Sequence, residues 1–222
     1  MPRQEKNMKP LIYVFCEGES EQAYIRFMKK AFSDAAVLKC VPQTGLFTEA
    51  KTKFQKDAKY KNYVSETDEI WFFFDVEDCD LEKWDHRYAI MKSLRKLRKK
   101  PSINIRLLMT SACIEYWLLL HFKLLSPSLH TVADKDNMMQ ELRKHIPAYQ
   151  KGDVLSIMEI AAKYKTAMQH GNQLLSLLEQ DGLPSRNDLD ERYRWLYQCS
   201  RTFTNVHEAI EFLEHYRKAN NQ

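Results

Sequence analysis

The chain has 222 residues, of which 44% are hydrophobic and 29% charged, and only 5 are glycine and 7 proline. This composition excludes a disordered or fibrous protein, and the formal charge of +4 permits a polyanionic partner without requiring one. The five cysteines show no CxxC pair, which excludes the usual zinc spacings and fits a reducing compartment. The polar start and the absence of an apolar run of about 18 residues predict a cytoplasmic protein that makes no membrane contact.

Apolar runs of strand length alternate with helical patterns in the first half of the chain. Residues 1–10 are expected to form a flexible arm. Strands are predicted over residues 11–15, 36–43, 69–74 and 104–110. Helices are predicted over 21–32, 87–100 and 111–125, the second stopped by Pro101, and the lysine-rich residues 48–64 form a helix or loop. This order predicts an α/β fold with a mostly parallel sheet flanked by helices.

Residues 126–222 carry only helical patterns, over 136–146, 154–180, 190–199 and 205–219. The predicted organisation is therefore an α/β domain over residues 11–125 and a helical C-terminal region, 126–222, packed on it. Asn205 and Glu208 have the spacing of a capping box at the start of the last helix. His121 is expected to be a structural histidine.

Acidic residues follow three of the predicted strands. Glu17 and Glu21 follow the first, Asp75, Glu77 and Asp78 follow the third, and Glu115 lies in the helix after the fourth. The carboxyl ends of parallel strands share one edge of a sheet, so these side chains are expected to converge.

Carboxylate oxygens are the ligands preferred by Mg²⁺ and Mn²⁺, and extra carboxylates would suit a second ion. The sequence therefore predicts a Mg²⁺ or Mn²⁺ site. Its expected ligands are Glu17, Glu21, Asp75, Glu77 and Asp78, and its expected catalytic residues are Glu17, Asp75 and Glu115.

The stretches "CEGESE" and "FFFDVED" resemble the Glu and DxD motifs of the TOPRIM fold of topoisomerases, primases and nucleases. Together with "SACIEYWLLLHF", "YQKGDVLSIM" and "FTNVHEAIEFL" they resemble the RloB-like family. The resemblance implies a TOPRIM-like (Rossmann-like) nuclease of phage defence or abortive infection, often encoded beside an AAA-type ATPase.

By the same resemblance, the family's two glutamates fall on Glu17 and Glu21, and its DxD pair falls on Asp75 and Glu77. A glutamate stands where aspartate is usual, so Asp78 is an alternative ligand. The implied substrate is DNA or RNA, with tRNA among the possibilities.

A basic run at the end of the helix predicted over 87–100 is the expected nucleic-acid surface, and a solvated helix face is the alternative. Its members are Lys92, Arg95, Lys96, Arg98, Lys99 and Lys100. Lysines between residues 51 and 61 could extend this surface, and Tyr60 and Tyr63 could stack on unpaired bases.

Two other functions remain open from the sequence. In a haloacid-dehalogenase-like phosphatase, Asp75 would be the nucleophile, although that fold expects its motif on the leading strand, with aspartate in place of Glu77. In a regulatory or binding subunit of a defence complex, the acidic edge would hold only a structural ion.

Overall fold

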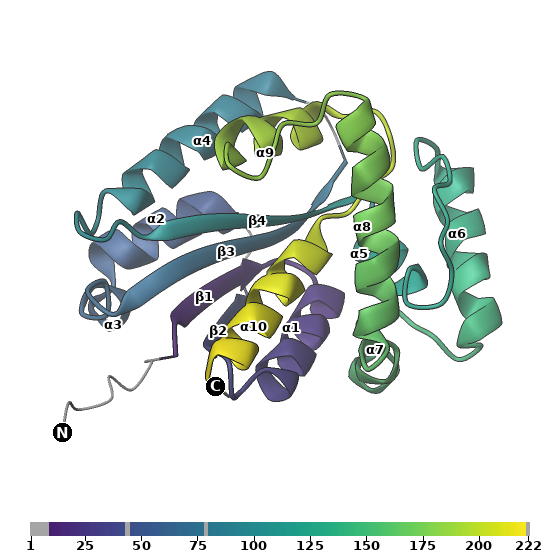
Figure 1. Cartoon of the computed structure of the whole chain (residues 1–222), viewed down its shortest axis with the longest axis horizontal. Coiled ribbons are helices and arrows are strands. Elements are labelled where there is room, and N and C mark those ends of the chain that lie inside the picture. Colours follow the sequence, from purple (N-terminus) through teal and green to yellow (C-terminus); the bar gives the residue numbers. More distant parts are fainter. Residues whose placement is uncertain (1–8, 43–44, 78–79, 221–222) are drawn as a thin grey trace.

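The computed structural model describes residues 9–42, 45–77 and 80–220. Most of the predicted arm, residues 1–8, and the alternative ligand Asp78 lie outside these ranges. Within them, one sheet has the strand order β2-β1-β3-β4, with every neighbouring pair parallel. The strands are β1 (Leu11–Cys16), β2 (Val37–Pro42), β3 (Thr67–Val76) and β4 (Asn104–Ser111). Figure 1 confirms the predicted α/β class, and the arrangement is consistent with a Rossmann-like, TOPRIM-like fold.

Helices cover both faces of this sheet and both of its edges. The helices of the described residues are α1 (Glu19–Ala31), α2 (Leu46–Lys56), α3 (Ala58–Lys61), α4 (Leu81–Arg95), α5 (Ile114–Leu119), α6 (Val132–His145), α7 (Val154–Ala161), α8 (Tyr164–Gln180), α9 (Leu189–Gln198) and α10 (Val206–Asn220). None of these helices, which are those of the described residues, is both long enough and apolar enough to cross a bilayer.

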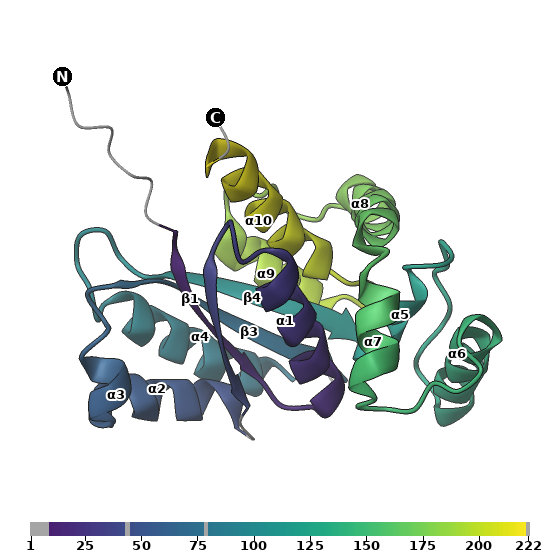
Figure 2. The same cartoon turned by 90° about the horizontal axis from the view of Figure 1, so that it is seen from below.

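Alternate residues of the strands enter two separate apolar cores. Tyr13 and Phe15 of β1 belong to a core shared with α2, α4 and α9, whereas Ile12 and Val14 belong to a core shared with α1, α5, α7 and α10. Figure 2 shows these layers on either side of the sheet. Burial on both faces explains why β1 and the middle of β3, from Ile70 to Phe74, are continuously apolar and do not alternate with polar residues.

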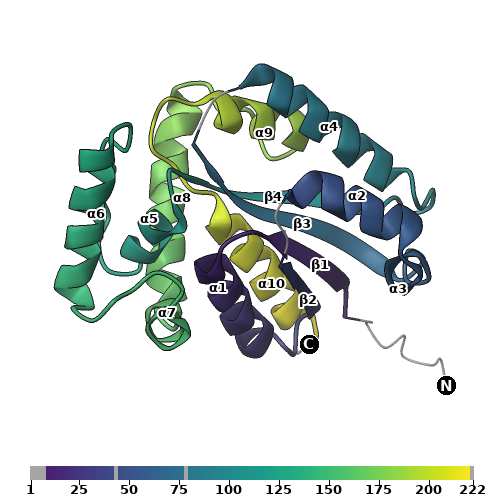
Figure 3. The same cartoon turned by 180° about the vertical axis from the view of Figure 1, so that it is seen from behind.

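The carboxyl ends of β3 and β4 point toward α5, α6, α7 and α8 (Figures 1 and 3). The opposite, amino edge of the sheet carries α3 and the connection from α4 to β4. The acidic residues that follow the strands therefore lie at the edge covered by the second half of the chain.

The chain returns to β4 just before α10. Thr110 and Thr204 form an isolated antiparallel bridge. The Asn205 side chain accepts a hydrogen bond from the Met109 N–H (2.7 Å) and donates one to the Leu107 carbonyl (2.9 Å). The predicted capping box is therefore wrong, because the Asn205 amide pairs with the backbone of β4.

Ala112 adopts a left-handed backbone conformation, with φ of 64°, in the turn between β4 and α5. Its N–H donates to the Val76 carbonyl (3.0 Å), and the Cys113 N–H donates to the Ser111 carbonyl (2.8 Å). These bonds fix a tight turn from the end of β4 into α5. A residue with a Cβ is strained in this conformation by about 1–2 kcal/mol.

We expect Ala112→Val to lower the free energy of unfolding by about 1–3 kcal/mol, because a β-branched side chain worsens the left-handed strain at a buried position. Ala112→Gly should stay within about 1 kcal/mol of the wild type, since relief of strain is offset by the greater freedom of the unfolded chain. Urea denaturation measures both, with Ala133→Val at an exposed position as the control. Equal stability of Ala112→Val and wild type would contradict the strained turn.

Candidate metal and active site

An open pocket of about 230 Å³ lies at the carboxyl edge of the sheet. It is called the acidic pocket below. Its lining comes from the start of α1, from β3, from the start of α5 and from the connection between α6 and α7, and comprises Gly18, Glu19, Ser20, Glu21, Asp75, Ile114, Glu115, Lys151 and Gly152. The predicted convergence of acids from separate strand ends therefore holds for Glu21, Asp75 and Glu115.

Glu115 is the most firmly held acid of the pocket, with 1% of its surface exposed. Its Oε1 accepts hydrogen bonds from Ser20 Oγ (3.3 Å) and the Tyr149 hydroxyl (3.0 Å). Its Oε2 lies 3.6 Å from Lys151 Nζ. Ser20 Oγ also accepts the Gly152 N–H (3.0 Å), so the network ties α1 and α5 to the connection before α7.

The acids of the pocket are poorly neutralised. Burial, followed by repulsion from Glu21 and Glu115, raises the pKa of Asp75 well above its ordinary value. Burial also raises the pKa of Glu21 to about 7, with smaller contributions from Glu115 and Glu17 opposed by a backbone hydrogen bond and by Lys151. Lys151 is the one basic side chain in the lining of this pocket as the structure describes it. The pocket therefore favours either bound protons or an added cation.

Two glycines allow the chain to pack closely around these acids. A Cβ on Gly18 would lie 2.1 Å from Glu21 Oε2, so a larger residue would displace that carboxylate. Gly152 has φ of +77°, and a Cβ there would lie 2.9 Å from the Cβ of Glu19. Position 152 therefore requires glycine for two reasons: the backbone is left-handed there, and it packs closely against α1.

The other predicted ligands point elsewhere. Glu17 is exposed, and its Oε1 accepts the N–H of Gly45 (3.2 Å) at the start of α2. Glu77 is exposed and lies 3.4 Å from Lys135 Nζ in a neighbouring pocket. Their roles as ligands stay predictions, as does that of Asp78.

The acidic pocket suits a hard cation that keeps much of its water. Across the described ranges, no group of three or more His, Cys, Asp and Glu side chains is arranged to enclose a metal ion. Mg²⁺, however, is usually held by one or two carboxylates and several waters. Asp75 Oδ1 is buried and accepts no hydrogen bond from any described residue, so it is a buried oxygen acceptor that lacks a partner.

The predicted nucleic-acid residues lie in the last turn of α4 and directly after it, at the amino edge of the sheet and away from the acidic pocket. Both arginines of this run are held by the protein itself. Arg95 contacts both carboxylate oxygens of Asp190, at 2.6 and 2.8 Å. Arg98 donates to the carbonyls of Pro101 and Ser65, each at 2.7 Å.

The lysines of the same run, Lys92, Lys96, Lys99 and Lys100, are exposed. Their role in binding nucleic acid stays a prediction. Tyr60 is buried, with 7% of its surface exposed, and packs against Phe54, so the expectation that it stacks on bases is wrong.

Three residues of the Glu115 network had no assigned role from the sequence: Ser20, Tyr149 and Lys151. A sequence signal existed only for the turn, since Gly152 precedes Asp153, whose side chain caps α7 by accepting the N–H groups of Leu155 and Ser156. His121 fulfils its expected structural role. Its Nδ1 donates to the Trp117 carbonyl and its Nε2 accepts the Tyr24 hydroxyl, while burial lowers its pKa to about 3.

Fold and site together define an α/β protein with a parallel Rossmann-like sheet and a carboxylate-rich pocket at its carboxyl edge. Residues 12–213 match the family described as RloB-like protein, so the chain belongs to the RloB-like family. Neither the curated proteins nor the solved structures include one that matches the chain.

Proposed function

We propose that the protein is a nuclease that hydrolyses phosphodiester bonds of DNA or RNA at the acidic pocket with Mg²⁺ or Mn²⁺. The observation that carries the proposal is Asp75. Its buried Oδ1 lacks a partner, and its pKa is raised by burial and by the neighbouring acids Glu21 and Glu115. A carboxylate kept in this state is destabilising unless a cation joins it.

Asp75 and Glu21 are the residues that would hold the cation. A divalent ion held there would supply positive charge to offset the negative charge of the phosphoryl oxygens. Gly18 leaves room beside the Glu21 carboxylate because it has no Cβ.

The remaining groups of the pocket position the substrate. Glu115 is fixed by Ser20 and Tyr149 and in turn holds Lys151 in the pocket. The Lys151 ammonium, whose side chain remains 67% exposed, is available to a phosphate oxygen of the substrate.

Cleavage should require Mg²⁺ or Mn²⁺ and stop in excess EDTA while the fold is retained, because two apolar cores hold the sheet without a metal. The measurement is cleavage of labelled single-stranded RNA and DNA, with circular dichroism as the check on folding. Full cleavage in EDTA would rule out the metal mechanism. Phosphorylation of Asp75 by a phosphomonoester would instead favour the phosphatase alternative.

From the family resemblance we also propose a role in phage defence, with an AAA-type ATPase as a partner. Sequencing of RNA and DNA ends from infected cells that express the wild type or Asp75→Asn tests this role. New ends that depend on Asp75 would support it and would identify the substrate. Protection that is unchanged in Asp75→Asn would favour the alternative of a non-catalytic subunit.

A further inference from the structure

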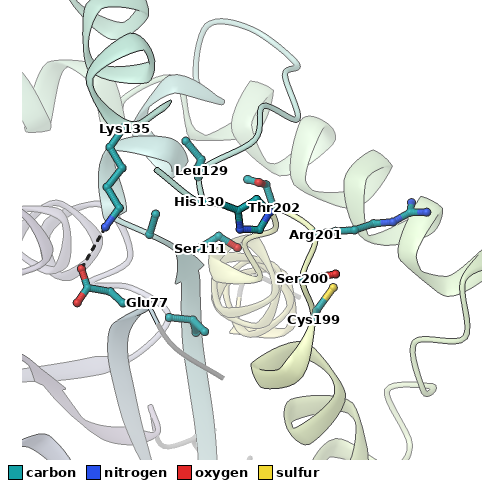
Figure 4. Close-up of a pocket in the computed structure, with 11 residues that line it drawn as sticks. Glu77, Ser111, Leu129, His130, Lys135, Cys199, Ser200, Arg201 and Thr202 are labelled. Atoms are coloured by element: carbon teal, nitrogen blue, oxygen red, sulfur yellow. Dashed lines mark hydrogen bonds and ion pairs between the residues drawn. The ribbon is translucent and has the colours of Figure 1, made fainter. Parts of the chain in front are cut away.

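A second pocket, of about 240 Å³, adjoins the carboxyl ends of β3 and β4. We call it the β3–β4 pocket. It is bounded by the start of α6 and by the segment that follows α9 (Figure 4). Its polar lining includes Glu77, Ser111, His130, Lys135, Ser200 and Arg201.

The two pockets share the same strand ends. Asp75 lines the acidic pocket, and Glu77, two residues further and about 7 Å along an extended chain, lines the β3–β4 pocket. Likewise, Ser111 at the end of β4 lines the β3–β4 pocket, and Glu115 at the start of α5 lines the acidic pocket. A polymer that crosses this edge of the sheet can therefore occupy both pockets.

Several hydrogen-bond donors of the β3–β4 pocket are free for a ligand. Ser111 Oγ accepts the Phe203 N–H (2.9 Å), which leaves its own hydrogen to donate. The side chains of His130 and Ser200 are exposed and line the same pocket. In Figure 4, Ser111 and His130 lie together in the middle of the pocket.

Two cations flank these donors. Lys135 Nζ is 3.4 Å from Glu77, and since both side chains are substantially exposed, this ion pair is weak and exchangeable. Arg201 is held by Asp181 at 2.6 Å, and Figure 4 shows its guanidinium turned away from Ser111 and His130. Lys135 is therefore the cation placed to enter the pocket.

We propose that the β3–β4 pocket binds a phosphate of the nucleic-acid strand, next to the phosphodiester held in the acidic pocket. This inference rests on the proposed nuclease function. The acids of the neighbouring pocket repel a polyanion, so phosphate contacts are needed on the same edge of the sheet to hold the strand. Hydroxyl, imidazole and ammonium donors are the groups that contact phosphates in nucleic-acid complexes. In the absence of nucleic acid Lys135 pairs with Glu77, and a bound phosphate replaces Glu77 as its partner.

The test is binding of short fluorescein-labelled single-stranded RNA and DNA, measured by fluorescence anisotropy in EDTA across a salt series. Lys135→Ala should weaken binding about tenfold and make the slope of log K against log salt shallower by about 0.7. Lys144→Ala on the same helix removes a lysine that pairs with Glu141, and it should bind as the wild type does. Glu77→Gln should strengthen binding, because it releases Lys135 from its ion pair. General damage to the fold would weaken binding, so an increase in affinity cannot come from misfolding.

Wild-type binding by Lys135→Ala, or weaker binding by Glu77→Gln, would overturn the inference. So would a loss confined to a variant with Lys96, Lys99 and Lys100 changed to alanine, which would place the strand at the amino edge. If binding depends on Lys135 but no metal supports cleavage, the nuclease proposal fails and the phosphate pocket stands. If the wild type cleaves and Lys135→Ala binds normally, only the pocket fails.

Discussion

Replacing Asp75 with asparagine is expected to abolish cleavage and, at the same time, to stabilise the metal-free protein. The amide keeps the shape of the side chain but removes the negative charge that would hold a cation. Loss of several kcal/mol of charge stabilisation in the transition state corresponds to a decrease in the rate of cleavage of about 10³-fold or more. The same change removes a carboxylate whose pKa is raised by burial and by Glu21 and Glu115, so it relieves repulsion in the folded state.

Thermal unfolding in EDTA measures the second effect, and each kcal/mol should raise Tm by about 2–4 °C for a chain of this size. Asp136→Asn is the matched control, because Asp136 is exposed on α6, and it should alter neither rate nor Tm. Added Mg²⁺ should stabilise the wild type but not Asp75→Asn. An Asp75→Asn variant that cleaves at the wild-type rate would show that the site lies elsewhere.

The second large effect concerns pH and Glu21. Its pKa rises from 4.5 to about 7 on folding, so the folded protein binds this proton more tightly than the unfolded chain does. Its contribution to stability is therefore fully present below pH 4.5 and is lost as the pH rises through about 7. The loss amounts to about 3 kcal/mol, at about 1.4 kcal/mol for each pH unit.

Glu21→Gln cannot ionise and should flatten the fall in stability between pH 4.5 and 7. Urea unfolding of wild type and variant across this range in EDTA gives the difference. Glu82→Gln is the control, since Glu82 occupies the first turn of α4 as Glu21 does that of α1, but is exposed. Parallel stability curves for wild type and Glu21→Gln would contradict the buried, proton-binding state of Glu21.

The sheet was predictable because continuous apolar runs identify strands buried on both faces, and three acidic strand ends were predictable from parallel topology. Helix ends were less so. The predicted start of α4 was residue 87, but the helix begins at Leu81, because the Asp80 side chain accepts the N–H groups of Glu82 and Lys83. The helix predicted over 154–180 is divided into α7 and α8, a break for which the sequence offers no glycine or proline.

Contacts between distant residues limited prediction of the site. Lys151 and Tyr149 reach Glu115 only because the connection before α7 packs against α1, and no local pattern encodes that packing. For the same reason Asn205 was interpreted from its spacing to Glu208 and not from its contact with β4. Glu17 and Glu77 illustrate the converse, since both follow strands yet are turned toward Gly45 and Lys135.

The hydrogen bonds around Glu115 also bear on the order in which the molecule folds. The bond from Gly152 to Ser20 spans 132 residues, and that from Ser20 to Glu115 spans 95. Contacts of such sequence separation close large loops and form slowly. A nascent chain that has emerged only through β4 already contains Glu21 and Asp75 but neither Glu115 nor Lys151. The pocket is therefore complete only after most of the chain has left the ribosome and packed.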